Sequence, residues 1–254
     1  MFHRTDLTSN CMTDPINVSD TTSDDIKSLC NQLITGSEKV QKKLIPQLGN
    51  LGGLGLDVLM EFLLKRRGSK ATPSDGRAYQ ILYNSKLPNI QKFLQDYFPQ
   101  GVVKLESERN INYSPIEKLL AVQNWEVADR MTNQKMCELA GDSAVKRKWL
   151  YFTEVNNFPI VDLQTINNLW LVNSEGKFGF SVQREICLAL GKNWESIWNK
   201  IGWKKGNNWT RYPKEFIWSI DAPRGHLPLS NQLRGVRVFA SLMAHPAWSR
   251  EEKS

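Results

Sequence analysis

Residues 114–141 read SPIEKLLAVQNWEVADRMTNQKMCELAG, and this stretch predicts two consecutive helices. Ser114, Pro115 and Glu117 are of the types expected at the N-cap, the first and the third position of a helix, where they form a capping box. A second set of apolar residues follows with helical spacing and ends at Gly141, a typical residue after a helix C-terminus. The stretch therefore predicts the start of a helical domain.

Upstream, residues 23–98 predict a small bundle of short helices. Ser23, followed by two aspartates, is a favourable helix start, and apolar residues then recur at helical spacing. A basic turn before Gly68 is typical of a helix end. Residues 1–22 are rich in Thr, Ser, Asp and Asn and predict a disordered lead. Residues 99–113 lack periodicity and predict a linker.

Downstream, residues 114–249 predict an all-helical core domain, with a short tail at 250–254. Asp162 is expected to cap the start of its helix. Gly, Asn, Pro, Trp and Arg dominate residues 202–229, and the aromatic content of this segment predicts a structured loop. Further helices are predicted at 143–151, 162–173, 181–190, 194–201 and 230–244. The predicted fold class is all-α, with an N-terminal bundle and a C-terminal core domain.

Charge and aromatic residues are concentrated in the second half of the chain. The net charge is +7 over 254 residues. Residues 135–254 contribute +6 of it, from 17 Lys/Arg against 11 Asp/Glu, and all nine tryptophans follow residue 124. This balance favours an anionic partner. The four cysteines are widely spaced, so a zinc site and a disulfide framework are both unexpected, and a reducing compartment is the simplest interpretation.

The sequence offers little evidence for catalysis. It contains none of the common catalytic or nucleotide-binding motifs. The glycine-rich run at 49–55 lacks a preceding strand and a lysine, so a tight turn between helices is a better interpretation than a phosphate loop. Glu154 is the one carboxylate near the expected pocket, and a carboxylate without a positioned partner is weak evidence for an enzyme.

A basic segment near the C-terminus is the best candidate for ligand contact. Asn231, Arg234 and Arg237 are spaced so that a helix would carry them on one side within two turns. Guanidinium groups bind carboxylates or phosphates with two parallel hydrogen bonds, and the amide of Asn231 can donate and accept. The alternative is an ordinary basic helix face in solvent.

Aromatic residues between 202 and 218 supply the apolar counterpart. They include Tyr212 and Phe216, and they are too many to leave in water. They form either local core or one wall of a cleft, with Phe152 and Val155 on the opposite wall. Such a cleft, with cations at its rim, suits a large, flat, anionic molecule.

Several segments closely resemble the genomes-uncoupled family of porphyrin-binding proteins. The resemblance is strong over residues 115–249 and weaker over 23–98. The segments that carry it are KWLYFTEV at 148–155, DLQTINNL at 162–169, FGFSVQR at 178–184, IGWK at 201–204, GNNWTRYP at 206–213 and, above all, GHLPLSNQLRGVRV at 225–238.

The resemblance implies a core shaped like a cupped hand and a protein that is not an enzyme. It implies binding of protoporphyrin IX and magnesium protoporphyrin IX, and stimulation of magnesium chelatase through the large porphyrin-binding subunit of that enzyme. Asn133 stands where relatives can carry an arginine, and Tyr212 where some carry a tryptophan; the first difference removes one cation from the rim of the implied site. The implied porphyrin-binding residues are Phe152, Val155, Tyr212, Phe216, Asn231, Arg234 and Arg237.

The resemblance also implies a location in the plastid stroma, if the chain is plastid-encoded, or in a cyanobacterial cytoplasm. An acidic N-terminus without an apolar segment argues against a secretion signal and a transit peptide. We expect a monomer that associates peripherally with thylakoid or envelope membranes and does not bind nucleic acid. The competing interpretation is a single-stranded nucleic-acid binding module, because such modules combine basic and aromatic residues.

Overall fold

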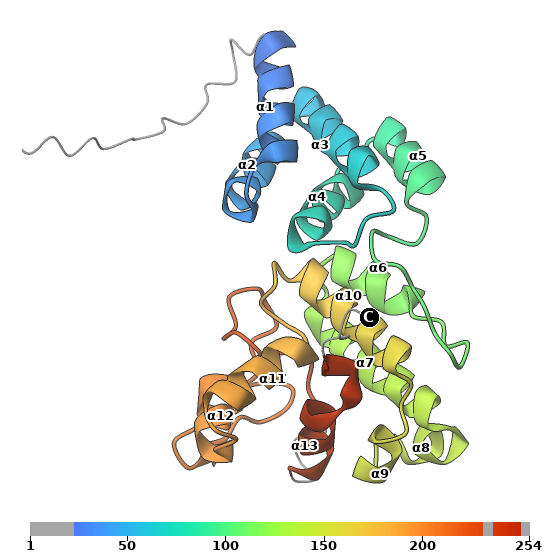
Figure 1. Ribbon diagram of the computed structural model, residues 1–254, viewed down its shortest axis with the longest axis vertical. Coiled ribbons are helices and arrows are strands. Elements are labelled where there is room, and N and C mark those ends of the chain that lie inside the picture. The colour runs from blue at the N-terminus through green and yellow to red at the C-terminus, as the bar shows by residue number, and fades with distance from the viewer. Residues whose placement is uncertain (1–22, 231–235, 250–254) are drawn as a thin grey trace, which may run out of the picture.

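The computed structural model describes residues 23–230 and 236–249, which form two helical bodies, one above the other in Figure 1. The predicted all-α fold class is confirmed. The exception within the described residues is a small antiparallel hairpin made by β1 (Lys204–Lys205) and β2 (Asn208–Trp209). No helix in these two ranges is long and apolar enough to cross a membrane.

The N-terminal body is the predicted small bundle. Its helices are α1 (Ser23–Thr35), α2 (Glu38–Asn50), α3 (Gly53–Arg66), α4 (Pro73–Asn84) and α5 (Pro88–Tyr97). Their inward faces share one core, in which Ile45, Leu59, Phe62 and Leu82 are fully buried. Burial of apolar faces against one another is what stabilises helices this short.

The C-terminal body contains a second, larger core. Its helices are α6 (Ser114–Ala121), α7 (Trp125–Ala140), α8 (Asp142–Arg147), α9 (Phe152–Val155), α10 (Ile160–Asn173), α11 (Phe180–Ala189), α12 (Trp194–Lys200), α13 (Arg237–Ala244) and a 3-10 turn, η2 (Pro246–Trp248). Helix α10 lies at the centre of this body, and most of its side chains are buried. The Trp170 indole donates to the Thr132 hydroxyl at 3.0 Å, which ties α10 to α7.

Helix α4 joins the two bodies by packing against α10 and α6. The buried Gln80 amide donates to the Leu120 carbonyl at 3.1 Å and to the Asn173 carbonyl at 2.8 Å. Close packing also requires Gly76, because a β-carbon there would lie 2.2 Å from the carbonyl oxygen of Val172. The junction is therefore a packed interface with specific hydrogen bonds.

Two predicted helix caps are wrong. Ser114 was predicted as an N-cap, but it is the first residue of α6. Glu117 was predicted to close the capping box, but it is buried, and its carboxylate accepts from the Asn173 amide at 3.0 Å. Burial raises the pKa of Glu117 to about 8. Asp162 lies in the first turn of α10 but does not cap it, because Pro159 is the N-cap; its carboxylate accepts from the Tyr113 hydroxyl at 2.7 Å and from the Glu108 N–H at 2.9 Å. Both carboxylates hold distant segments together.

The segment predicted as a linker, residues 99–113, packs onto the C-terminal body through buried Val103 and Tyr113. Gly101 has a φ of 84°, and a β-carbon there would lie 2.1 Å from the Glu117 carboxylate. The division into domains at 23–98, 99–113 and 114–249 stays a prediction. The predicted lead at 1–22 and tail at 250–254 lie outside the described residues.

Two predicted helices have different bounds. The helix predicted at 143–151 ends at Arg147, because Lys148 adopts a left-handed conformation. The helix predicted at 230–244 begins at Arg237, since Ser230 is not helical and Val236 is its N-cap. Arg237 is therefore the first residue of α13 and not a residue in the middle of a longer helix.

Candidate functional site

The first group of predicted site residues lies where α9 packs against α13. The guanidinium carbon of Arg237 lies 5.5 Å from the centre of the Phe152 ring. Phe152 is half-buried and Arg237 is exposed, whereas Val155 is fully buried and belongs to the core. We call this surface the α9–α13 wall. It presents an apolar ring with a cation held beside it by cation–π attraction.

The cation on this wall is available to an anion. In the described part of the chain, no carboxylate lies within ion-pair distance of Arg237. Val236, the N-cap of α13, provides no side-chain cap, so backbone N–H groups of the first turn add positive partial charge beside the guanidinium. A carboxylate of a ligand could pair with the guanidinium and accept hydrogen bonds from these N–H groups.

The second group lies in the aromatic loop, residues 210–218. The Tyr212 ring centre lies 6.2 Å from that of Phe216 and 6.0 Å from that of Trp218. Phe216 is 5% exposed and fills the core, whereas 41% of Tyr212 is exposed. The Trp218 indole donates to the Pro213 carbonyl at 2.9 Å, which closes the loop on itself. Tyr212 is thus the exposed member of this group.

Other tryptophans near the loop are part of the core. Trp203 stacks on Trp198, with ring centres 5.5 Å apart and planes 3° apart, and Phe239 of α13 packs edge-on against both. The Trp203 indole donates to the His226 carbonyl at 2.8 Å. Trp203 therefore anchors the loop, while Trp209 of β2 remains 44% exposed.

His226, which the sequence did not single out for this role, fixes the base of the aromatic loop. Its Nε2 accepts from the Ile217 N–H at 3.2 Å, so its Nδ1 carries the proton and donates to the Ile201 carbonyl at 2.7 Å. Burial lowers the pKa of His226, which keeps the ring neutral in this arrangement. The ring also lies 5.2 Å from Phe216.

Asp129 of α7 holds the chain immediately before residue 231. Its carboxylate is 4% exposed and accepts from the Leu229 N–H at 2.7 Å. Burial raises the pKa of Asp129 to about 7. Burial, with a smaller contribution from the charge of Asp129, raises the pKa of Tyr212. Asn133 is half-buried one turn further along α7.

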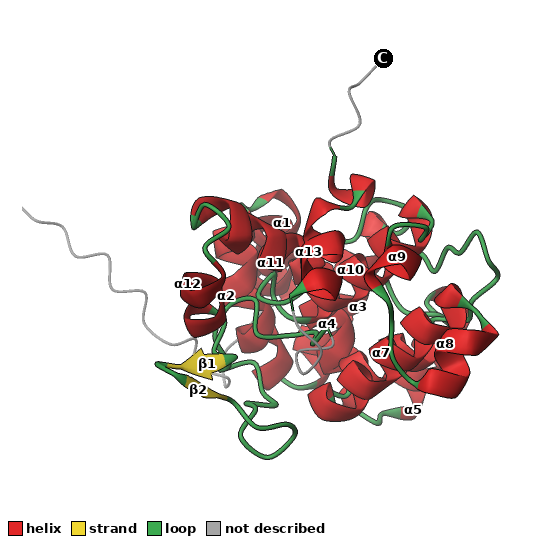
Figure 2. Cartoon of the chain, turned by 90° about the horizontal axis from the view of Figure 1, so that it is seen from below, coloured by secondary structure: helices red, strands yellow, loops and turns green. Residues whose placement is uncertain are grey.

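One short stretch of chain leads from α7 to the α9–α13 wall. Ser230 follows the Leu229 anchor beside α7, and Val236 precedes Arg237 on the α9–α13 wall. Six peptide units join Ser230 to Val236, so their α-carbons lie at most about 20 Å apart. Seen from below, α7, α8 and α9 lie on one side of the C-terminal body and the β1–β2 hairpin on the other (Figure 2). Asn231 and Arg234 lie outside the described residues, and their roles stay predictions.

Glu154 is already engaged by the protein. Arg147 binds both of its carboxylate oxygens, at 2.8 and 2.7 Å, and the Tyr151 N–H donates to it at 2.8 Å. The Arg147 guanidinium also lies 4.3 Å from the Tyr151 ring centre. Glu154 therefore has the geometry of a structural ion pair at the start of α9.

Two family models match parts of this chain. A family model described as "GUN4-like" matches residues 106–246, and one described as "ARM-like repeat domain, GUN4-N terminal" matches residues 16–99. The chain is 48% identical to a "Ycf53-like protein" of Synechocystis sp. over 229 residues, which cover 90% of this chain and 98% of the relative.

Two plant and algal proteins are also similar. A "Tetrapyrrole-binding protein, chloroplastic" of Arabidopsis thaliana is 37% identical over 146 residues, which cover 54% of this chain and 55% of that protein. The structure of GUN4 from Chlamydomonas reinhardtii superimposes with a TM-score of 0.53 at 43% identity, covering 57% of this chain and 96% of that one. These findings confirm the resemblance found in the sequence, and the chain belongs to the GUN4-like family.

Proposed function

We propose that this protein binds tetrapyrroles, without catalysing a reaction, between the α9–α13 wall and the aromatic loop. The observation that carries the proposal is the exposed guanidinium of Arg237 beside the Phe152 ring, at the uncapped start of α13. The name of the Arabidopsis relative, a tetrapyrrole-binding protein, supports the same ligand class.

The ligands that we propose are protoporphyrin IX and magnesium protoporphyrin IX. Each combines a flat apolar ring with two propionates. Phe152 and Tyr212 offer partly exposed rings against which the macrocycle can pack, whereas Val155 and Phe216 support these rings from the core. Arg237 and the first turn of α13 bind a propionate, and we propose the same role for Arg234, with Asn231 beside it.

Titration of protoporphyrin IX with tryptophan fluorescence as the signal tests this site. We expect Arg237→Gln to weaken binding by about tenfold, the loss expected for one charge-assisted hydrogen bond of about 1.5 kcal/mol. Arg224→Gln is the matched control, because Arg224 is an exposed arginine paired with Glu185 on α11. Unchanged affinity in Arg237→Gln, or equal losses in both variants, would contradict the proposal.

We also propose that the protein stimulates magnesium chelatase by contacting the large porphyrin-binding subunit of that enzyme. An assay of magnesium insertion with purified chelatase subunits tests this directly. The rate at limiting protoporphyrin IX is expected to rise on addition of the wild-type protein and to rise less with Arg237→Gln. A rate that does not change with the wild-type protein would exclude the stimulation while leaving tetrapyrrole binding intact.

We further propose a monomer in the plastid stroma or the cyanobacterial cytoplasm, peripherally associated with thylakoid or envelope membranes. The relatives in Synechocystis and in the chloroplast of Arabidopsis support this location. Sedimentation equilibrium tests the monomer, and co-sedimentation with thylakoid membranes tests the association. Nucleic acid is not among the proposed partners. Oligonucleotide binding that falls steeply with salt would favour the competing interpretation.

A further inference from the structure

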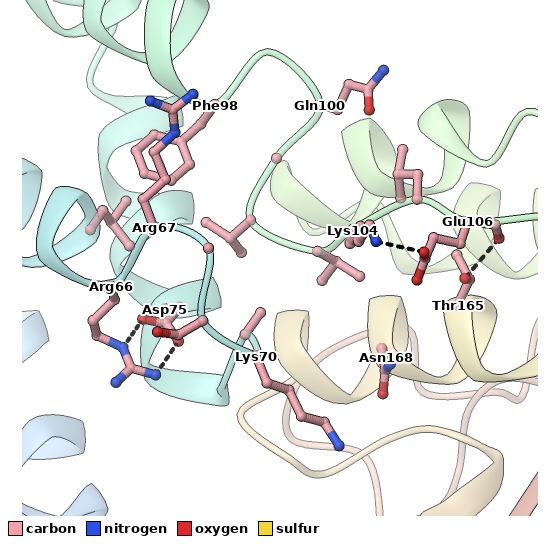
Figure 3. Close-up of a pocket in the computed structure, with 18 of the residues that line it drawn as sticks. Arg66, Arg67, Lys70, Asp75, Phe98, Gln100, Lys104, Glu106, Thr165 and Asn168 are labelled. Carbon is pink, nitrogen blue, oxygen red and sulfur yellow. Dashed lines mark hydrogen bonds and ion pairs between the residues drawn. The ribbon is translucent and has the colours of Figure 1, made fainter. Parts of the chain in front are cut away.

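A cavity of about 660 Å³ lies where the two bodies meet, away from the proposed tetrapyrrole site. Its walls come from the α3–α4 connection, from residues 97–106 and from α10 (Figure 3). Neither Arg237 nor Tyr212 lines it. A volume between about 300 and 1,000 Å³ at a domain junction is typical of a small-molecule site. The larger aliphatic and phenyl side chains that line it are Leu63, Phe98, Val102, Val103, Leu105 and Val161.

The cavity also carries more positive than negative charge. Arg66 is held by Asp75 through two contacts, of 2.5 and 2.9 Å, and Lys104 pairs with Glu106 at 2.6 Å. These pairs use both carboxylates that line the cavity. Two cations therefore remain, on the α3–α4 connection.

Those two cations, Arg67 and Lys70, are exposed at the cavity wall. Over residues 23–230 and 236–249, no carboxylate lies within ion-pair distance of either one. The Arg67 guanidinium is positioned over the Tyr97 ring, 5.6 Å from its centre. The side chain therefore loses less conformational entropy on binding an anion than an unrestrained arginine would. On α10, half-buried Asn168 adds an amide to the lining (Figure 3).

We propose that this cavity binds an amphipathic organic anion, with a carboxylate or phosphate at Arg67 and Lys70 and an apolar body against the apolar lining residues, which form the floor of the cavity. A free inorganic anion would leave the apolar floor in water, and a neutral apolar molecule would leave both cations without a partner. The ligand would contact the α3–α4 connection and α10 together. Its binding would therefore stabilise the junction between the two bodies.

Isothermal titration calorimetry of the full chain with octyl phosphate tests the proposal, with inorganic phosphate and octanol as separate arms. We expect one binding site for octyl phosphate, and binding at least about tenfold weaker for the other two, since each lacks half of the recognised chemistry. Octyl phosphate should also raise the melting temperature. Equal binding of inorganic phosphate would overturn the apolar part of the proposal, and equal binding of octanol would overturn the anionic part.

Variants locate the site. The double variant Arg67→Gln with Lys70→Gln is expected to weaken octyl phosphate binding by about fivefold or more, as expected for two partly exposed charge contacts. Lys39→Gln with Lys43→Gln removes the same charge from exposed positions on α2 and should leave binding unchanged. Arg237→Gln should also leave it unchanged. Equal weakening in all three variants would show a nonspecific charge effect, and weakening in Arg237→Gln alone would place the anion at the tetrapyrrole site.

Discussion

Asp129 accepts the backbone N–H of Leu229, and this contact joins α7 to the chain that leads toward Arg237. The pKa of its buried carboxyl is about 7, against an ordinary value of 3.8 in the unfolded chain. The folded protein therefore holds this proton more tightly than the unfolded chain does. The contribution of Asp129 to stability is complete below pH 4 and is lost as the pH rises through 7.

Asp129→Asn should remove this pH dependence, because the amide oxygen still accepts from Leu229 and carries no charge. We expect the free energy of unfolding of the variant, relative to the wild type, to rise by about 3 kcal/mol between pH 4 and pH 8. Urea unfolding at both pH values measures the difference. Asp57→Asn, at an exposed position on α3, is the control and should show no such change. The same difference at both pH values would contradict the account.

Single residues also show what the sequence could and could not predict. Arg237 was predicted as a site residue from its basic segment and Tyr212 from the aromatic loop, each with the family resemblance, and their roles stay predictions. Asp129 was not predicted, because its partner Leu229 is 100 positions away and only the fold brings them together. Glu117 was wrongly predicted as part of a helix cap, because local spacing does not reveal its contact with Asn173, which is 56 positions away.

Helices were easier to predict than their ends. The spacing of apolar residues gave α7, α10, α11 and α12 within a few residues. Helix starts depend on contacts outside the helix, so the predicted caps failed at α6 and α10. The loop after α12 was predicted as structured and aromatic, but its hairpin and its edge-on contact with Phe239 of α13 depend on tertiary contacts.

At the level of elements, the fit of α4 against α10 depends on the absence of a side chain at Gly76. Gly76→Ala should destabilise the protein by about 2–3 kcal/mol, because the added methyl group meets the backbone of Val172 and forces the two helices apart. Urea unfolding gives the change in free energy. Gly53→Ala, at the start of α3, is the matched control. A β-carbon there meets no atom within 4 Å, so the substitution should cost nothing. Equal stability of both variants would show that the junction tolerates a wider spacing.

At the scale of the whole molecule, the two bodies differ in composition as well as position. The tryptophans and most of the positive charge belong to the C-terminal body, which also carries the proposed tetrapyrrole site. The N-terminal body packs against α10 and α6 through α4, and the cavity beside this junction is the second proposed site. The uneven distribution of tryptophan and charge in the sequence predicted that the binding site lies in the C-terminal body. The cavity could not be predicted from the sequence, because its lining residues come from segments far apart in the chain.

The central claim is that a tetrapyrrole lies between the α9–α13 wall and the aromatic loop. A crystal structure of the protein with bound protoporphyrin IX tests it most directly. The account predicts a propionate oxygen about 3 Å from the Arg237 guanidinium, the usual length of a charge-assisted hydrogen bond, with the ring between Phe152 and Tyr212. A porphyrin bound with no contact to Arg237, or bound in the cavity beside α4, would contradict it.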